Sequence, residues 1–156
     1  MLLRAAPLAL AVLALAACGG GGKSAQTTTQ HSLLPPGCSA QQVQGIVTDF
    51  LAHPSLAPAG FFTSYRSQES DGRVFSTRNR ADALAHVKAR LDIGERARLL
   101  QLQVFPIDVN HVHIAFTLTR TAPDFARRGI HFRISNGTGT VDCAHGKVAS
   151  WSQKGP

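Results

Sequence analysis

Hydrophobic and polar residues alternate along the C-terminal half of the chain, and this alternation predicts strands. Over residues 111–120 the apolar side chains take every second position: Val112, Ile114, Phe116 and Leu118. A period of two is typical of a strand with one buried face and one wetter face. Residues 97–105, 129–135, 140–143 and 147–151 predict further strands, and the short turns between them indicate an antiparallel sheet.

The same alternation divides the predicted sheet into two faces. We expect Ile130, Phe132 and Ile134 to share the buried face with residues 112–118, with a bulge or bend at Asn136-Gly137. The opposite face is then polar and carries Gln101, Gln103, His113, Thr117 and Arg133. Such a face is either solvated or paired with a partner.

Two stretches before the sheet have the period of an α-helix. The first follows a Ser39 N-cap, ends at Pro54 and has an apolar stripe of Val43, Ile46, Val47, Phe50 and Leu51. The second follows an Asn79 cap, ends near Gly94 and has a stripe of Ala81, Leu84, Val87 and Leu91. Between the helices, residues 61–66 predict a first strand and residues 74–75 a short edge strand.

The N-terminal residues predict export. Residues 1–17 place one arginine before a short apolar run that ends in small residues, which is the layout of a secretory signal peptide. Residues 15–18, Leu-Ala-Ala-Cys, resemble a bacterial lipobox, which implies cleavage before Cys18 and attachment of diacylglycerol to its sulfur. The alternative is a signal peptide followed by a chance cysteine.

These features define three regions with different roles. Residues 1–17 are the predicted lipoprotein signal peptide, residues 18–37 a flexible tether rich in Gly, Ser, Thr and Gln, and residues 38–156 the folded domain. The lipid would hold the domain at a membrane on the extracytoplasmic side, at the extracellular face or in the periplasm. The net charge is +7, but the basic residues are scattered, which does not favour nucleic-acid binding.

Four segments of the domain resemble the nuclear-transport-factor-2-like (SnoaL-like) superfamily, and in particular bacterial exported proteins of that type. They are residues 61–66 (FFTSYR), 79–98 (NRADALAHVKARLDIGERAR), 115–120 (AFTLTR) and 146–151 (GKVASW). The resemblance covers roughly residues 38–152 and implies an α+β cone, a curved antiparallel sheet packed on N-terminal helices. The superfamily contains dehydratases, isomerases, cyclases and non-catalytic modules, so the fold alone does not choose an activity. In this family the outer sheet face often mediates dimerisation, which implies a homodimer through that face.

Two cysteines remain in the predicted domain. Because exported domains are oxidised, Cys38 and Cys143 are expected to form a disulfide; the alternative is two unpaired buried thiols. His111, His113 and His131 are the candidates for a metal site, but the expected pairing places His113 opposite residue 135 or 137, well away from His131. We therefore predict no metal, and no motif for a cofactor is present.

Tyr65, Phe116 and Trp151 come from segments that would line or cap the cone, and they are the candidate residues for binding a small apolar ligand. The alternative is an ordinary aromatic core. His86 and Asp82 lie four residues apart on the second helix and can touch, either as an acid–base pair at the mouth of a pocket or, more commonly, as a surface helix pair. The first hypothesis is a non-catalytic lipoprotein that binds a small apolar ligand or a protein partner. The alternatives are a SnoaL-like dehydratase or isomerase that uses a pocket His or Tyr, and a structural envelope protein without a pocket.

Overall fold

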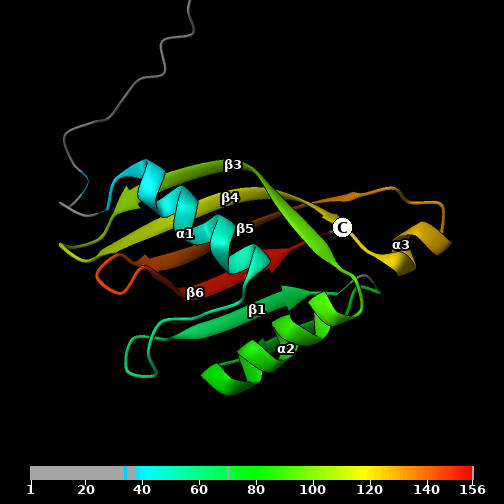
Figure 1. The fold of residues 1–156 in the computed structure, drawn as a ribbon, viewed down its shortest axis with the longest axis horizontal. Coiled ribbons are helices and arrows are strands. Elements are labelled where there is room, and N and C mark those ends of the chain that lie inside the picture. Colours follow the sequence, from blue (N-terminus) through cyan, green and yellow to red (C-terminus); the bar gives the residue numbers. More distant parts are fainter. Residues whose placement is uncertain (1–33, 35–37, 70, 156) are drawn as a thin grey trace, which may run out of the picture. The chain divides into compact units, whose positions relative to one another are not determined.

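A computed structural model describes residue 34, residues 38–69 and residues 71–155 of the chain. The predicted signal peptide, the lipidation residue Cys18 and most of the predicted tether lie outside the described residues. The elements follow the order α1 (Ala40–Ala52), β1 (Ser64–Gln68), β2 (Val74–Thr77), α2 (Arg80–Asp92), β3 (Arg96–Pro106), β4 (His111–Thr121), α3 (Pro123–Arg127), β5 (Arg133–Asp142) and β6 (Lys147–Lys154). The predicted α+β class is confirmed (Figure 1).

None of the described helices is long and apolar enough to cross a membrane.

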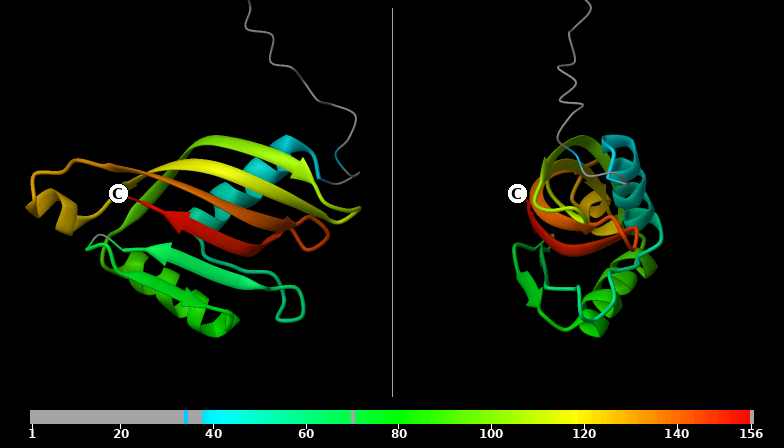
Figure 2. Two further views of the ribbon diagram at one scale, coloured as in Figure 1. Left: turned by 180° about the vertical axis from the view of Figure 1, so that it is seen from behind. Right: turned by 90° about the vertical axis from the view of Figure 1, so that its left-hand side faces the viewer.

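Six strands form one curved sheet in the order β2-β1-β6-β5-β4-β3 (Figure 2). All neighbouring pairs are antiparallel except β1 and β6, which run parallel, with Tyr65 opposite Trp151. The expectation of a purely antiparallel sheet is therefore wrong at this pair. Hairpin signals in a sequence report only strands that follow one another along the chain, whereas β1 and β6 are far apart in sequence.

Both predicted helices form and begin at the predicted caps. The Ser39 hydroxyl accepts a hydrogen bond from the Gln42 backbone amide, and the Gln42 side-chain oxygen accepts one from the Ser39 backbone amide. The Asn79 side chain accepts hydrogen bonds from the backbone amides of Ala81 and Asp82. Helix α1 buries Val43, Val47 and Phe50 against the sheet, whereas α2 buries only one residue completely. That residue is Ala83 and not the predicted Ala81, which is exposed.

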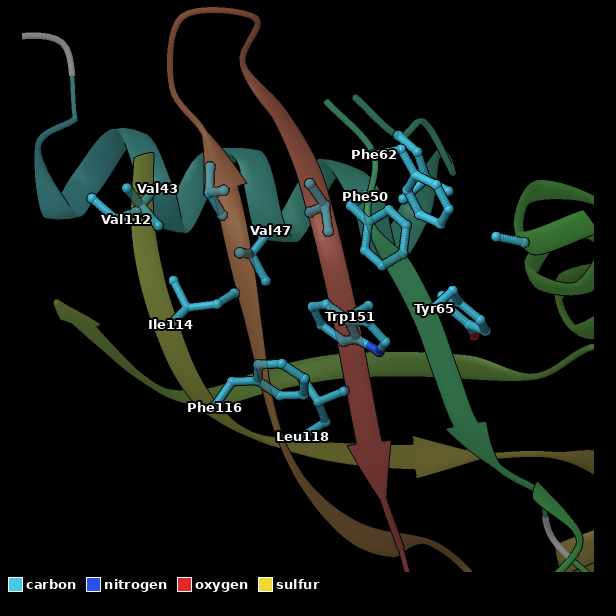
Figure 3. Packing of buried hydrophobic residues seen from close by; sticks show 14 of the residues in the cluster. Val43, Val47, Phe50, Phe62, Tyr65, Val112, Ile114, Phe116, Leu118 and Trp151 are labelled. Carbon is cyan, nitrogen blue, oxygen red and sulfur yellow. The ribbon is translucent and has the colours of Figure 1, made fainter. Parts of the chain in front are cut away.

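The core lies between α1 and the inner face of β4, β5 and β6 (Figure 3). The predicted alternation of β4 is confirmed, since Val112, Ile114, Phe116 and Leu118 are all buried and the residues between them are only partly covered. Ahead of the predicted domain start, Leu34 is half-buried and packs against the same core.

The predicted buried face of the next strand is wrong. Strand β5 runs without interruption through Asn136-Gly137, and Phe132 and Ile134 are 55% and 46% exposed. The inward positions are instead taken by Ser135, Gly137, Gly139 and Val141. The physical reason is the size of the neighbouring side chains: Phe116 and Ile114 of β4 fill the space above the two glycines. Bulky residues on β5 would have no room there.

A bulge shifts the faces of β3. The register changes between Leu99 and Gln101, so Leu99 is partly buried while Leu100 is 48% exposed. A short helix, α3, lies in the connection between β4 and β5. Five residues are too few to show a helical period.

Replacing Gly137 with alanine is expected to destabilise the domain by about 1–3 kcal/mol, because an added Cβ overpacks the core. That Cβ would lie on the Phe116 ring and on the backbone oxygen of Ser152. Chemical denaturation measures the effect. Gly60→Ala is the matched control, because a Cβ there meets no atom within 4 Å. Equal stability of the two variants would contradict the tight contact at Gly137.

Candidate functional site

A small cavity opens between the two long helices and the inner face of the sheet. Its volume is about 50 Å³, and residues on or next to α1, β1, α2, β3 and β6 line it. The apolar lining residues are Phe50, Leu51, Val87, Leu91, Ala97 and Trp151, and the polar ones are Tyr65, Ser67, Arg90, Glu95 and Gln153. One water needs about 10–15 Å³ of such volume, so the cavity has room for a few waters in this conformation.

Two of the three predicted pocket residues line this cavity. Tyr65 and Trp151 are both in the wall, side by side on the parallel pair β1–β6. Phe116 does not line it; its ring stacks on Trp151 with centroids 3.9 Å apart. Phe50 of α1 covers Trp151 from another side, at 5.0 Å (Figure 3). The aromatic cluster therefore fills most of the interior, and Phe116 is a core residue.

The polar end of the cavity is closed by a chain of charged side chains, which we call the ionic ladder: His86, Glu69, Arg90, Glu95 and Arg120. His86 Nε2 lies 2.9 Å from Glu69 Oε1, and Arg90 Nη1 lies 2.8 Å from Glu69 Oε2. Arg90 also bonds Glu95 Oε2, and Arg120 Nη2 lies 2.7 Å from Glu95 Oε1. Two carboxylates thus meet two guanidinium groups, and the charges balance.

Arg120 is the innermost member of the ionic ladder. Its side chain is 3% exposed, donates from Nε to Glu95 Oε1 at 2.8 Å and donates from Nη1 to the Gln68 carbonyl at 2.9 Å. A buried guanidinium needs such partners because its desolvation is costly. Glu95 accordingly has one carboxylate oxygen on Arg120 and the other on Arg90.

Tyr65 provides a hydroxyl at the edge of this charged region. Burial raises the pKa of Tyr65 well above its ordinary value of 10.0, the Ser67 hydroxyl acts in the opposite direction, and the carboxylates of Glu69 and Glu95 raise it further. The phenol therefore stays protonated across the physiological range and can serve as a hydrogen-bond donor or acceptor.

His86 does not pair with Asp82 as predicted. Its ring stacks face to face on Phe75, with centroids 3.9 Å apart, and its Nε2 bonds Glu69. The reason is that β2 and the end of β1 lie against this face of α2, so the histidine finds tertiary partners instead of a neighbour on its own helix.

The histidines proposed as metal candidates lie apart from one another. His111 Nδ1 is 2.9 Å from Asp108 Oδ1 in the β3–β4 turn, and His113 pairs across the sheet with Thr140 rather than with residue 135 or 137. His131 precedes β5, at the other end of the sheet. No group of three metal-ligating side chains forms among the described residues.

The outer sheet face carries four of the five predicted polar residues, but it also exposes the apolar side chains of Phe105 and Ile134. Gln101, Gln103, Thr117 and Asn136 line a groove there, and the Thr117 hydroxyl donates to Asn136 Oδ1 at 2.9 Å. Arg133 lies instead on the inner side, opposite Arg120, with its guanidinium 5.2 Å from the centre of the Phe125 ring. The prediction fails because the faces of β5 are reversed. A homodimer through the outer face stays a prediction.

Sequence reasoning missed the ionic ladder. One signal was present: Arg120 follows Val112, Ile114, Phe116 and Leu118 in the same alternation, so an arginine occupies a buried position of β4. A charge at such a position requires an opposite charge nearby. Its partner, Glu95, could not be named from the sequence. It precedes β3, 25 residues before Arg120, and lies beside it only because β3 and β4 pair along their whole length.

Comparison with known proteins gives a likeness to solved structures only. No family model and no curated protein matches the chain. A Mycobacterium tuberculosis protein of unknown function aligns at a TM-score of 0.49 and 14% identity, over 74% of this chain and 70% of that chain. An NTF2-like protein from Anabaena variabilis aligns at 0.43 and 12%, over 75% and 86%. A proposed polyketide cyclase from Xanthomonas campestris aligns at 0.41 and 14%, over 72% and 89%. Similarity this low supports no conclusion about activity.

Acid is expected to destabilise the domain through Glu69. Burial by itself would raise the pKa of Glu69, but the hydrogen bond from His86 and the charge of Arg90 outweigh it and hold the pKa below its ordinary value of 4.5. A carboxyl whose folded pKa is depressed contributes stability above its unfolded pKa, and loses it as pH falls through the folded pKa.

The measurement compares the free energy of unfolding of the wild type and Glu69→Gln between pH 5.5 and pH 3. The wild type should be more stable at pH 5.5. The gap should begin to narrow below about pH 4.5, where the unfolded carboxyl binds a proton while the folded one is still ionised, and it should close as pH falls through the folded pKa. A gap that stays constant across this range would contradict the depressed pKa.

Proposed function

We propose that this chain is a lipid-anchored extracytoplasmic protein whose domain is a non-catalytic module for a small ligand, mainly apolar with one polar group. The proposal rests on one observation: none of the titratable side chains that line the cavity is set up to exchange a proton. Of its titratable lining residues, Arg90 and Glu95 are paired within the ionic ladder, and Tyr65 has a raised pKa. A general acid or base needs a pKa near the working pH and a free proton path.

The dehydratase or isomerase alternative has less support. His86, the histidine nearest to Tyr65, is not part of the cavity wall, and its Nε2 is engaged by Glu69. Using Glu95 as a base would require breaking its bonds to two arginines. Such a rupture leaves a buried guanidinium without its counter-charge and costs several kcal/mol.

The cavity wall supports a ligand of a particular chemistry. Phe50, Val87 and Trp151 offer apolar surface, while Ser67, Gln153 and the Tyr65 hydroxyl offer hydrogen bonds at one end. The present volume of about 50 Å³ limits the size to a few heavy atoms. Leu51, Val87 and Leu91 are only half-buried, so rotation of these side chains can widen the space without disturbing the ionic ladder.

Benzyl alcohol joins one apolar ring to one hydroxyl. It is larger than the present volume admits, so it is a suitable probe of the cavity widened by rotation of these side chains. If it binds the folded domain, the unfolding temperature should rise with its concentration, with a Kd in the millimolar range for so few atoms. The test variant is Ala97→Leu, which fills the cavity from β3. The matched control is Ala115→Leu, which adds the same atoms on the outer face of β4.

We expect the wild type and Ala115→Leu to be stabilised by the probe and Ala97→Leu not to be. Equal responses of all three chains would place binding elsewhere, and no response in any of them would remove the support for a ligand site of this chemistry.

The anchor is supported by the sequence at residues 15–18 and is tested separately. Cells expressing the chain are fed an alkyne-bearing fatty acid, and label on the protein is compared with that on Cys18→Ser. Label on the wild type alone, together with a membrane-bound protein that starts at residue 18, is the expected result. An unlabelled wild type that keeps residues 1–17 would overturn this part of the proposal.

A further inference from the structure

The β3–β4 hairpin presents apolar side chains to solvent at its tip. Phe105, Ile107 and Val109 are 46%, 56% and 73% exposed, although each is large and apolar. Ile107 and Val109 flank Asp108 in the turn itself, between the end of β3 and the start of β4. Exposed apolar residues gathered at one place mark an interaction surface more often than single scattered ones do.

The polar groups of the turn bond one another. Asp108 Oδ1 accepts hydrogen bonds from the amides of Asn110 and His111 at 2.8 and 2.9 Å, and the His111 side chain bonds the same carboxylate. The Ile107 amide donates to the His111 carbonyl at 3.0 Å. The Asp108 side chain is 52% exposed, so its carboxylate can remain in water at the level of the headgroups while Ile107 and Val109 enter the apolar edge.

The first helix of the domain begins at this same end. Cys38, at the start of α1, is joined to Cys143 by a disulfide, and the Cys143 amide donates to the Asn110 carbonyl at 2.8 Å. A bond and a hydrogen bond therefore connect the beginning of the domain to the tip. Figure 1 shows the start of α1, the β3–β4 hairpin and the β5–β6 hairpin at one end of the sheet, with α3 at the other.

We propose that the tip, formed by Phe105, Ile107 and Val109, inserts into the surface of the lipid bilayer and orients the domain there. The inference extends the proposed function, because a lipid on Cys18 would place this end closest to the membrane. Residues 18–37 reach at most roughly 70 Å when fully extended. Insertion of two or three apolar side chains at the level of the headgroups adds a second, reversible contact to such an anchor.

The test uses the chain from residue 18 with Cys18→Ser, which retains every contact described above and carries no lipid. It is mixed with phosphatidylcholine vesicles in 0.5 M salt, so that attraction of the basic surface to charged lipid is screened. Sedimentation with the vesicles measures the bound fraction. The double variant Ile107→Ser/Val109→Ser should bind at least about tenfold more weakly, because two half-exposed aliphatic side chains no longer leave water.

Phe132→Ser is the matched control. It removes an apolar side chain that is 55% exposed, but it lies beside the first residue of β5, whereas the tip is beside the last. Nine strand positions separate these ends, or roughly 30 Å. Phe132→Ser should bind vesicles as the parent chain does.

A fluorescence measurement reports directly whether the tip enters the bilayer. Val109→Cys, labelled with an environment-sensitive dye in the same chain, should shift to shorter emission wavelength and be quenched by lipids brominated along their acyl chains. Tip variants that bind vesicles as well as the parent, or a label that is not quenched, would overturn the proposal. So would a tip-dependent dimer, seen by light scattering, that binds no vesicles. Because this chain carries no lipid, these outcomes do not depend on whether Cys18 is modified.

Discussion

Glu95→Gln is expected to lower the free energy of unfolding by about 3–5 kcal/mol, the cost of leaving a buried charge without its partner. Glu95 holds Arg120, whose side chain is 3% exposed, and Arg90, whose side chain is 19% exposed. Glutamine has nearly the same shape, so packing is retained and the loss reports the charge. Denaturant unfolding at neutral pH, with circular dichroism as the signal, gives the difference.

Two controls show whether that loss belongs to the buried pairing. Asp92→Asn breaks the Lys88–Asp92 pair, whose side chains are 72% and 61% exposed, and should cost no more than about 1 kcal/mol. The double variant Glu95→Met/Arg120→Met removes both members of the inner pair and should recover much of the stability lost in Glu95→Gln. A loss in Glu95→Gln no larger than that in Asp92→Asn would mean that water screens the ladder.

Removing the disulfide is expected to cost about 2–5 kcal/mol. Cys38 and Cys143 are 105 positions apart, and their Cα atoms lie 5.5 Å apart, which is within the range of unstrained bridges. Linking residues so distant in sequence strongly limits the unfolded chain, and the entropy model gives nearly 5 kcal/mol for such a loop. The variant is Cys38→Ser/Cys143→Ser, and its unfolding is compared with that of the parent chain.

Intact mass first establishes that the bridge is present. The oxidised parent chain should gain 2 Da on reduction, and added reductant should lower its stability but not that of Cys38→Ser/Cys143→Ser. Cys18→Ser serves as the control, because it removes a thiol outside the described residues and should not change the free energy of unfolding. Two free thiols in the protein purified from an oxidising compartment would contradict the bridge.

Much of the fold followed from local patterns. The helices were predictable because Ser39 and Asn79 are good caps and because apolar residues recur on one side of each helix. Strand β4 was predictable because every second residue is large and apolar. In these elements the local preference and the tertiary packing agree, so a single sequence is sufficient.

The errors arose where packing between strands decides the outcome. The outward position of Phe132 and Ile134 depends on two large side chains of the neighbouring strand. These are Phe116 and Ile114, which need the small inward residues Gly137 and Gly139. The exposure of Leu100 depends on a β-bulge that the residue types around it do not predict. A period of two identifies a strand but not which of its faces is buried, because a shift by one residue exchanges them.

The candidate site was less predictable than the fold. Tyr65 and Trp151 line the cavity, Phe116 packs behind Trp151, and ligand binding by these residues stays a prediction. The members of the ionic ladder come from residues 69–120. They lie just after β1, on α2, just before β3 and near the end of β4. Such long-range charge pairing leaves only one trace in the sequence, the arginine at a buried strand position.

The binding proposal rests on the cavity beside the single tryptophan of the chain, Trp151. Its indole Nε1–H donates to Gln153 Oε1 at 3.2 Å, and both residues line the cavity, so this one proton resonance reports on the space between them. We predict that titration with benzyl alcohol moves the indole resonance along a saturable curve in the wild type and leaves it in place in Ala97→Leu. An indole resonance that does not move in the wild type, at probe concentrations that shift other signals, would contradict the account.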